Sequence, residues 1–237
     1  ANGHPDGPSA RVPSSIVDIT TGMWAATAIQ AALARRERTG EGELVETALV
    51  DSGFQLMCHQ AMTMLATGRA PAKTGAVTPM AAPYETLATR DGEVMIAAGN
   101  DGLFRRLCGA LGVPELLDDP RFGTVADRVA NRTELHDLLE ARTLPMARAQ
   151  AEQVLFAAEV PVSAVNPLDV ALQSPAGRER RMLVDARDAT DGLQLMRLPI
   201  MPPERELRRP PRVDEHAEEI RAELRAATGA RVEPTER

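Results

Sequence analysis

The first long hydrophobic stretch of the chain has the pattern of a helix. Residues 23–33 are apolar and rich in alanine, and the chain then turns basic over residues 35–38 before Gly40. Cationic side chains in a last turn and a glycine just beyond it are typical of a helix C-terminus. A short apolar run at residues 16–17 precedes the helix and has the character of a strand. The pattern therefore predicts a strand-to-helix junction, with Asp18 at the junction.

Further elements are predicted before residue 84. Residues 43–49 alternate enough to form a strand, and residues 51–66 form a second apolar helix. Strand, helix and strand in succession indicate an α/β layer. Residues 68–83 are rich in proline and glycine, which indicates a loop that could cross from one domain to another.

The remainder of the chain begins with a predicted hairpin. Strand-like runs at residues 84–89 and 93–98 flank an Asp-Gly pair, which is a strong hairpin signal. Helices dominate the rest, and we expect them at residues 102–111, 115–117, 125–139, 147–159, 168–172 and 215–226. Further strands are expected at residues 160–165, 182–185 and 193–198, and residues 199–212 form an extended arm rich in proline and arginine.

Composition narrows the class of protein. A chain of 237 residues can bury a sizeable core, and its net charge of -7 argues against a nucleic-acid backbone as partner. The 2 cysteines, Cys58 and Cys108, lie far apart in apolar helical stretches, which indicates buried thiols in a reducing compartment. The 4 histidines show no metal-ligand spacing, so we expect no metal site.

The sequence predicts a soluble, cytoplasmic protein. No apolar run approaches the length of a membrane span, and no secretory signal opens the chain. The first residues have no initiator methionine and read like an interior loop rich in glycine and proline. We therefore expect the chain to be part of a longer protein.

Asp18 has two possible roles at the predicted junction. A carboxylate at a helix start can accept hydrogen bonds from the first-turn amides and face the positive end of the helix dipole, which stabilises by about 0.5–2 kcal/mol. A carboxylate held rigidly at a strand-to-helix junction can also sit at the mouth of a pocket and do chemistry. The local sequence leaves both roles open.

Short motifs follow one another in a specific order along nearly the whole chain. They include Asp18-Ile19-Thr20-Thr21-Gly22, Thr39-Gly40-Glu41-Gly42, Pro83-Tyr84, Thr89-Arg90-Asp91-Gly92, Asn100-Asp101, Asp119-Pro120-Arg121-Phe122, Arg128-Val129-Ala130-Asn131-Arg132, Val160-Pro161 and Glu215-His216. In this order and spacing the chain resembles the class III CoA-transferase family, to which carnitine and formyl-CoA transferases belong.

The resemblance implies that Asp18 is the catalytic nucleophile. In the family an aspartate attacks an acyl-CoA thioester to give a mixed anhydride, and CoA thiolate returns to form an aspartyl-CoA thioester. An acceptor carboxylate then collects the CoA. Carboxylates are ionised at neutral pH and need no general base for this attack. The implied substrates are an acyl-CoA and a carboxylic acid, with no permanently bound cofactor and no metal.

Residues 73–79 stand where the family carries a glycine-containing substrate loop. The resemblance implies that Gly75 and Thr78 in this loop, and Tyr84 beyond it, bind substrate. Loop amides are the best candidates for stabilising the oxyanion that forms during acyl transfer. Relatives often have Asn and His where this chain has Ala76 and Thr78. An ordinary interdomain crossover is the alternative interpretation of the loop.

The resemblance also implies an α/β fold, as the latter part of a two-domain CoA-transferase III fold. Residues 1–79 would be the remaining part of an incomplete, nucleotide-binding-type large domain, with the nucleophile helix and the crossover loop. Residues 80–190 would form a small α/β domain, and residues 191–237 a C-terminal return arm and helix. The family's first half carries most CoA contacts, so no CoA-binding residue is assigned. The resemblance also implies an interlocked homodimer for the full-length form of the protein.

Two alternatives stay open at this point. α-Methylacyl-CoA racemases resemble the same architecture but use the aspartate and a histidine as an acid/base pair. Their helix opening tends to be Asp-Phe-Ala-Gly, and this chain's Asp18-Ile19-Thr20-Thr21-Gly22 favours transfer. The other alternative is a catalytically incompetent fragment or an assembly partner that lacks the CoA-binding half.

Overall fold

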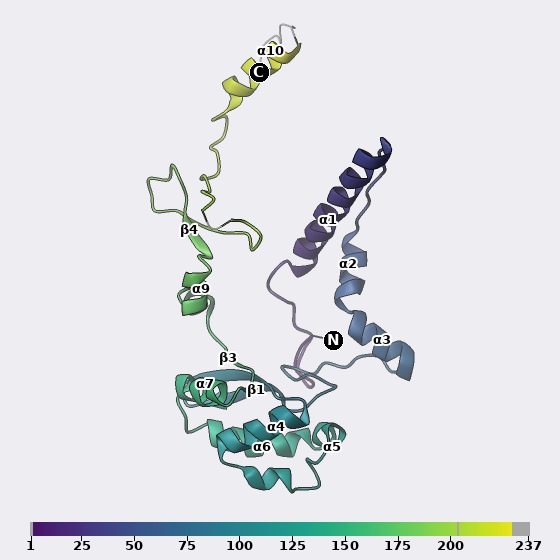
Figure 1. Cartoon of the computed structure of the whole chain (residues 1–237), viewed down its shortest axis with the longest axis vertical. Helices are drawn as coiled ribbons and strands as arrows, with labels where there is room; N and C mark the ends of the chain where they lie inside the picture. The colour runs from purple at the N-terminus through teal and green to yellow at the C-terminus, as the bar shows by residue number, and fades with distance from the viewer. Residues whose placement is uncertain (1, 203, 229–237) are drawn as a thin grey trace. The chain divides into compact units, whose positions relative to one another are not determined.

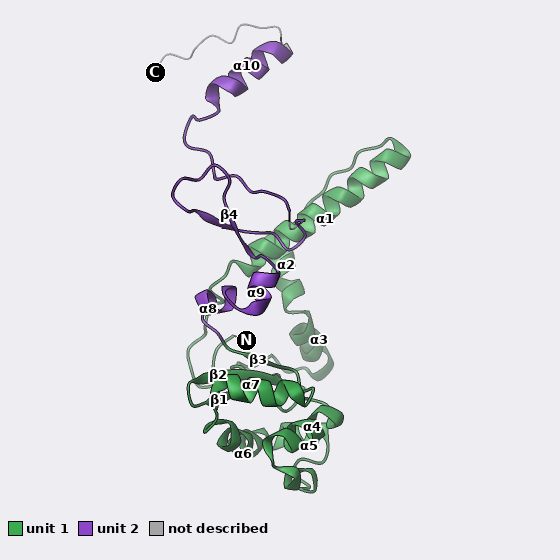
Figure 2. Ribbon diagram, turned by 60° about the vertical axis from the view of Figure 1, so that its left-hand side comes forward, with its two compact units in different colours: residues 1–165 green, residues 166–237 purple. Residues whose placement is uncertain are grey.

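The computed structural model describes residues 2–202 and 204–228 (Figure 1). Its internal contacts divide the chain into two units, Ala1–Val165 and Asn166–Arg237 (Figure 2). The division of the chain after residues 79 and 190 stays a prediction. The elements of the first unit are α1 (Ile16–Thr39), α2 (Leu49–Leu56), α3 (Cys58–Thr67), β1 (Tyr84–Thr89), β2 (Gly92–Ala97), α4 (Asp101–Leu111), η1 (Pro114–Leu117), α5 (Val125–Ala130), α6 (Arg132–Thr143), α7 (Arg148–Ala157) and β3 (Val162–Ala164).

Helix α1 begins earlier than the sequence predicts. Ser15 is its N-cap, so Ile16 and Val17 form the first helical turn instead of a strand. Two β-branched residues are too short a run to specify a strand once a helix can start beside them. The predicted C-terminus is confirmed, because the helix ends at Thr39 and Gly40 adopts a left-handed conformation with φ of 77°. A glycine takes this conformation without a steric penalty.

The strand predicted at residues 43–49 is wrong. Residues 41–48 are an extended connection without strand pairing, and α2 already begins at Leu49. Leu44 is 83% exposed, so the alternating pattern has no partner strand to pack against within the described residues. The α/β layer expected before residue 68 is therefore absent from the described part of this region, which is helical. The predicted second helix is broken at Met57 into α2 and α3.

Residues 73–75 return to contact residues 3–7 near the start of the chain. The Gly75 N–H donates to the Gly3 carbonyl over 2.9 Å, and the Lys73 ammonium donates to the Gly7 carbonyl. Helices α1 to α3 lie between these two segments in the sequence. These two contacts therefore join the ends of the segment that contains all three helices.

The predicted hairpin is confirmed and belongs to a three-stranded antiparallel sheet in the order β1-β2-β3. Thr89 pairs with Gly92 across the turn, and Met95 pairs with Ser163 on β3. Helices α4, α6 and α7 gather around this sheet (Figures 1 and 2). Fully or almost fully buried apolar side chains form the shared core: Leu87, Val94, Ile96, Phe104, Leu107, Leu135, Leu139 and Leu155.

Helix α6 contacts β1 through polar as well as apolar side chains. Glu140 accepts a hydrogen bond from the Ala88 N–H over 2.8 Å, and Thr143 donates to the Ala88 carbonyl over 2.7 Å. One turn earlier, His136 Nδ1 lies 2.8 Å from the carboxylate of Glu85, which is 3% exposed. These contacts fix the helix in register with the strand.

The helices before the sheet have a large apolar surface. None of the residues of α1 is buried, and its exposed side chains include Ile19, Met23, Trp24 and Ile29. Among the described residues, α1 alone is long and apolar enough to cross a membrane, judged by length and composition, with a mean hydropathy of 1.2. This corrects the prediction that no apolar run has that length. Core helices of soluble proteins meet the same criterion.

The second unit contains short elements. They are α8 (Leu168–Leu172), α9 (Pro175–Glu179), β4 (Leu183–Asp185), β5 (Gln194–Met196) and α10 (Ala217–Thr228). The strands predicted at residues 182–185 and 193–198 are present as β4 and β5, which pair antiparallel, and the arginine-rich arm returns to pair Arg208 with Arg187 in a parallel bridge. The expected helix at the end of the chain is confirmed as α10. Helix α9 was not predicted, although Ser174 caps it through the Gly177 N–H.

Candidate functional site

Asp18 lies in the first turn of a 24-residue helix. It is the third helical residue, whereas Ser15 occupies the N-cap position, so the junction geometry expected of Asp18 is wrong. The carboxylate is exposed and makes no hydrogen bond or ion pair with the described residues. The positive end of the helix dipole still favours its charge. The helical backbone therefore sets the position of Asp18, and its carboxylate has no partner among the described residues.

Two hydroxyl groups fix the start of α1 against α2. The Thr21 hydroxyl donates to the Ser52 hydroxyl over 2.8 Å, and Thr21 Oγ1 also lies 2.8 Å from the Val17 carbonyl oxygen. Ser52 is 3% exposed and donates in turn to the Ala48 carbonyl. Since Thr21 is one turn beyond Asp18, this contact holds the helical turn that carries the candidate nucleophile.

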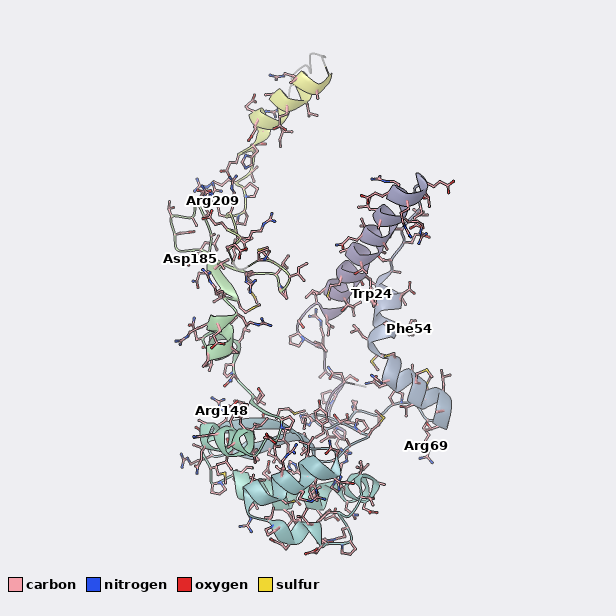
Figure 3. The ribbon with its side chains drawn as sticks, viewed as in Figure 1. Trp24, Phe54, Arg69, Arg148, Asp185 and Arg209 are labelled. Carbon is pink, nitrogen blue, oxygen red and sulfur yellow. The ribbon has the colours of Figure 1, made fainter. Side chains whose placement is uncertain are left out.

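An open groove of about 380 Å³ runs beside the same helices. Figure 3 labels one of its side chains, Trp24 on α1, and also Phe54 on α2. The residues that line the groove are Trp24, Glu46, Thr47, Asp51, Ser52 and Gln55. The carboxylates of Glu46 and Asp51 disfavour a bound anion through like-charge repulsion. The groove is therefore unsuited to a phosphate or carboxylate group.

The loop over residues 68–83 is confirmed as a connection without helix or strand. Within it, the structure joins two of the predicted substrate-binding residues, because the Thr78 N–H donates to the Tyr84 carbonyl over 3.0 Å. Gly75 has φ of 64°, and a Cβ there would lie 3.2 Å from His4 Nδ1. No hydrogen bond or ion pair within the described residues links Asp18 to Gly75, Thr78 or Tyr84.

Several amides of the loop already have acceptors. Gly75 donates to Gly3, Val77 donates to the Thr74 carbonyl over 3.3 Å, and Thr78 donates to Tyr84. An oxyanion needs amides that are not already engaged. Among the described residues 73–79, the amides of Lys73, Thr74 and Ala76 donate to no protein acceptor. These three are the available donors, in place of Gly75 and Thr78.

A buried arginine supports the end of the loop. Arg128 on α5 is 1% exposed, and its Nε donates to the Ala82 carbonyl over 2.9 Å. Its two terminal nitrogens donate to the Phe122 carbonyl over 3.0 Å and to Asp101 Oδ1 over 2.7 Å. The guanidinium also lies 4.5 Å from the ring centroid of Phe104. A guanidinium can satisfy several acceptors at once in a fixed geometry.

A second arginine contacts the same segment. Arg132 begins α6, four positions after Arg128, and its Nη2 lies 3.1 Å from the Thr78 carbonyl and 3.3 Å from the Pro79 carbonyl. Neither arginine was predicted as a site residue, although both belong to a motif noted in the sequence. Their place in this motif was the signal available in the sequence.

Groups for metal or thiol chemistry are not assembled in the described residues. No cluster of three or more His, Cys, Asp or Glu side chains there could hold a metal ion. Burial raises the pKa of the Cys108 thiol to about 11, against a lowering effect of Arg128. A protonated, buried thiol is a poor nucleophile. The candidate chemistry therefore rests on the Asp18 carboxylate.

Comparisons with known proteins agree on one family. A family model described as CoA-transferase family III matches residues 1–217. Succinate--glutarate CoA-transferase from Agrobacterium fabrum is 35% identical over 94% of this chain and 56% of its own length. Acetyl-CoA:oxalate CoA-transferase from Acetobacter aceti is 37% identical over 78% of this chain and 48% of its own length. The chain thus spans about half the length of these curated relatives.

Solved structures give the same result for the fold. A CAIB/BAIF family protein from Brucella suis matches with a TM-score of 0.77 and 38% identity, over 94% of this chain and 59% of that chain. Rv3272 from Mycobacterium tuberculosis matches with a TM-score of 0.78 and 25% identity, over 91% of this chain and 58% of that chain. The α/β arrangement of helices and small sheets is therefore shared with known structures.

Proposed function

Because the chain belongs to CoA-transferase family III, we propose that it carries the nucleophile of an enzyme that moves CoA from an acyl-CoA to a carboxylic acid. The observation that carries the proposal is the exposed Asp18 carboxylate, which has no protein partner and lies in the first turn of α1. The chain spans about half the length of the curated relatives that it matches. Activity is therefore proposed for the complete enzyme.

The proposed reaction conserves every atom without an added cofactor. An oxygen of Asp18 attacks the thioester carbon, CoA thiolate leaves, and a mixed anhydride forms. The thiolate then attacks the Asp18 carbonyl carbon, which releases the donor acid and leaves an aspartyl-CoA thioester. The acceptor carboxylate attacks this thioester to form a second anhydride. Attack of the thiolate on the acceptor's carbonyl carbon gives the new acyl-CoA and frees Asp18.

The leaving group determines where catalysis is needed. A thiolate with a pKa of about 8.5 departs less readily than a carboxylate, so the first adduct tends to revert. A helix dipole supplies at most about 2 kcal/mol, whereas enzymatic acceleration needs at least about 8 kcal/mol. Positioning of the thioester and amide donors aimed at the oxyanion must supply most of the difference. The amides of Lys73, Thr74 and Ala76 are our candidates for those donors.

The names of the relatives suggest the class of acid. They include succinate, glutarate, oxalate and mesaconate transferases, and all four of these acids are short dicarboxylic acids. We extend the proposal to a short dicarboxylic acid as one substrate of this protein. These relatives are transferases, which does not favour the racemase alternative.

Assembly and location complete the proposal. Apolar side chains such as Ile19, Met23 and Phe54 are exposed on α1 and α2, and extensive exposed apolar surface marks a site of protein association. We propose that a homodimer of the complete enzyme covers them, and that the enzyme is cytoplasmic. Light scattering of the complete enzyme should give the mass of a dimer. A monomer at micromolar concentration would contradict this part.

Oxygen transfer from the acceptor tests the covalent route. The complete enzyme is incubated with succinyl-CoA and glutarate that carries ¹⁸O in its carboxylates, and the peptide that contains Asp18 is analysed by mass spectrometry. The second anhydride leaves one acceptor oxygen on Asp18, so we expect ¹⁸O in this peptide only when both substrates are present. Hydroxylamine should trap the aspartyl thioester on the same peptide.

Substitution of the nucleophile supplies the control. Asp18→Ala should lower kcat by about 1,000-fold or more, because the covalent route is lost. Asp169→Ala is the matched control, since Asp169 is also an exposed aspartate in a first helical turn. It should keep full activity and normal labelling. CoA transfer at the wild-type rate by the Asp18→Ala enzyme would refute the proposal.

A further inference from the structure

We propose that Arg132 is a positioning residue, which holds the Thr78 end of the loop so that the Thr78 hydroxyl faces substrate; this inference rests on the proposed function. The loop over residues 68–83 contains Gly75 and Thr78 but no helix or strand. A segment without regular structure needs other contacts to fix a side chain for binding. Arg132 and Arg128 provide such contacts from two neighbouring helices.

Three tethers act on the segment that joins the loop to β1. The Thr78 N–H donates to the Tyr84 carbonyl over 3.0 Å, so residues 78 and 84 are linked directly. Arg132 holds the carbonyls of Thr78 and Pro79, and Arg128 holds the carbonyl of Ala82. Arg132 thus fixes the start of this backbone segment and Arg128 fixes it near its end, while the bond from Thr78 to Tyr84 links the two ends.

The contacts leave one polar group of Thr78 unused. Its N–H and its carbonyl both have protein partners, whereas its hydroxyl makes no hydrogen bond with any described residue. Thr78 is half-buried, so the hydroxyl is neither sequestered in the core nor fully in solvent. A fixed backbone with a free hydroxyl is the arrangement expected of a group that binds an oxygen-bearing ligand.

Arg132 is placed for this role by helix α6. Leu135 and Leu139 bury the apolar side of the helix in the core, and Glu140 and Thr143 bind the backbone of β1 at Ala88. The helix start is therefore fixed relative to the strand that follows the loop. A planar guanidinium can reach two neighbouring carbonyls from one nitrogen, whereas a lysine ammonium is a single point on a flexible stem.

Substitution of Arg128 would be a less informative test of the tether than substitution of Arg132. It is completely buried and also pairs with Asp101 and Phe122, so its removal would disturb the core. Arg132 is half-buried and its hydrogen bonds go to the carbonyls of Thr78 and Pro79. Substitution of Arg132 therefore releases the tether with little effect on the core.

Hydrogen exchange of the complete enzyme tests the tether without turnover. The variants are Arg132→Met, Arg132→Lys and the control Arg148→Met, whose arginine also donates to a backbone carbonyl, that of Val165 (Figure 3). Arg132→Met should speed exchange at the Thr78 amide by about 5- to 30-fold, as loss of one or two hydrogen bonds implies. Arg132→Lys should give a smaller change, and Arg148→Met none at Thr78.

Steady-state kinetics test the consequence for the reaction. We expect Arg132→Met to raise KM for the acid or acyl-CoA by about 10-fold or more with a smaller change in kcat, and Arg132→Lys to restore part of the loss. Thr78→Val should raise the same KM, and Arg132→Met should add little to it because both changes act on one hydroxyl.

Several outcomes would overturn the inference. They are unchanged exchange at Thr78 in Arg132→Met, an unchanged KM in that variant, or equal losses in Arg132→Met and Arg148→Met. Failure of the proposed function is a separate result. A wild-type enzyme that transfers no CoA would refute the function, whereas exchange at Thr78 decides the tether by itself.

Discussion

Arg128 and Asp101 form an ion pair between a buried guanidinium and an exposed carboxylate. The side chain of Arg128 is 1% exposed and that of Asp101 is 65% exposed, and the two are joined by a bond of 2.7 Å. The arginine brings a charge into the core, while the aspartate keeps most of its contact with water. The stability of this region should therefore depend far more on the cation than on its anionic partner.

We expect Arg128→Met to lower the free energy of unfolding by about 3–5 kcal/mol, because the carbonyls of Ala82 and Phe122 lose their donor in a buried site. Asp101→Asn keeps an acceptor oxygen and should cost about 1 kcal/mol or less. Urea denaturation of the two variants measures both values. Arg121→Met, which removes an exposed arginine paired with Asp119, is the control with little effect. A larger loss in Asp101→Asn than in Arg128→Met would contradict this account.

The contact between Thr21 and Ser52 should couple α1 to α2. In a double-mutant cycle of Thr21→Val and Ser52→Ala, we expect a coupling free energy of about 0.5–1.5 kcal/mol, the net contribution of a typical hydrogen bond. Thermal unfolding followed by circular dichroism gives the four stabilities. Thr27→Val removes only the bond from Thr27 to the Met23 carbonyl, so it should show no coupling to Ser52→Ala. Additive losses for Thr21 and Ser52 would disprove the contact.

Glu215 should titrate at unusually low pH. The Arg209 guanidinium, followed by the Arg212 N–H, lowers the pKa of Glu215 from 4.5 to about 2. Because the pKa is lower in the folded state, the stabilisation is complete above about pH 4.5 and is lost as the pH falls toward 2. Carbon-detected NMR of the Glu215 carboxyl checks the value. Arg209→Met should raise it, whereas Arg205→Met should not. An unchanged titration in Arg209→Met would exclude this cause.

Cys108 should resist thiol reagents in the folded protein. Its thiol is buried on α4, and desolvation raises its pKa to about 11, so little thiolate is present at pH 8. Cys58 is only partly buried and should react first. In a Cys58→Ser variant, we expect slow reaction with a disulfide reagent until denaturant is added. Rapid labelling of this variant in native buffer would show that the site is open.

Elements set by local signals could be predicted from the sequence. The Arg90-Asp91 turn and the runs on either side specify the hairpin of β1 and β2, and Gly40 specifies the end of α1. Helix breaks were missed where the pattern continues across them. Thr124 and Asp127 form a reciprocal cap at the start of α5, but the stop at Asn131 divides an apolar pattern that reads as one helix.

Contacts between distant residues could not be predicted. The pairing of β2 with β3 joins residues that are separated in the sequence by α4, η1, α5, α6 and α7. No local pattern sets the register of this pairing. Residues 43–49 show the opposite error, because alternation alone does not provide a neighbouring strand. For the site, the sequence motifs indicated Asp18 as the nucleophile, which stays a prediction, and the amides of Gly75 and Thr78 are engaged within the protein.

The backbone hydrogen bond from Gly75 to Gly3 joins two glycines that both have positive φ angles. Gly3 has φ of 126°, and a Cβ there would lie 2.6 Å from the Pro8 carbonyl oxygen. Gly75 also has a positive φ, with His4 against it. The contact that closes the segment containing α1, α2 and α3 therefore depends on the absence of side chains at these two positions. A methyl group at Gly3 would clash with the Pro8 carbonyl oxygen, and a side chain at either glycine would be strained by the positive φ, so both substitutions should weaken this closure.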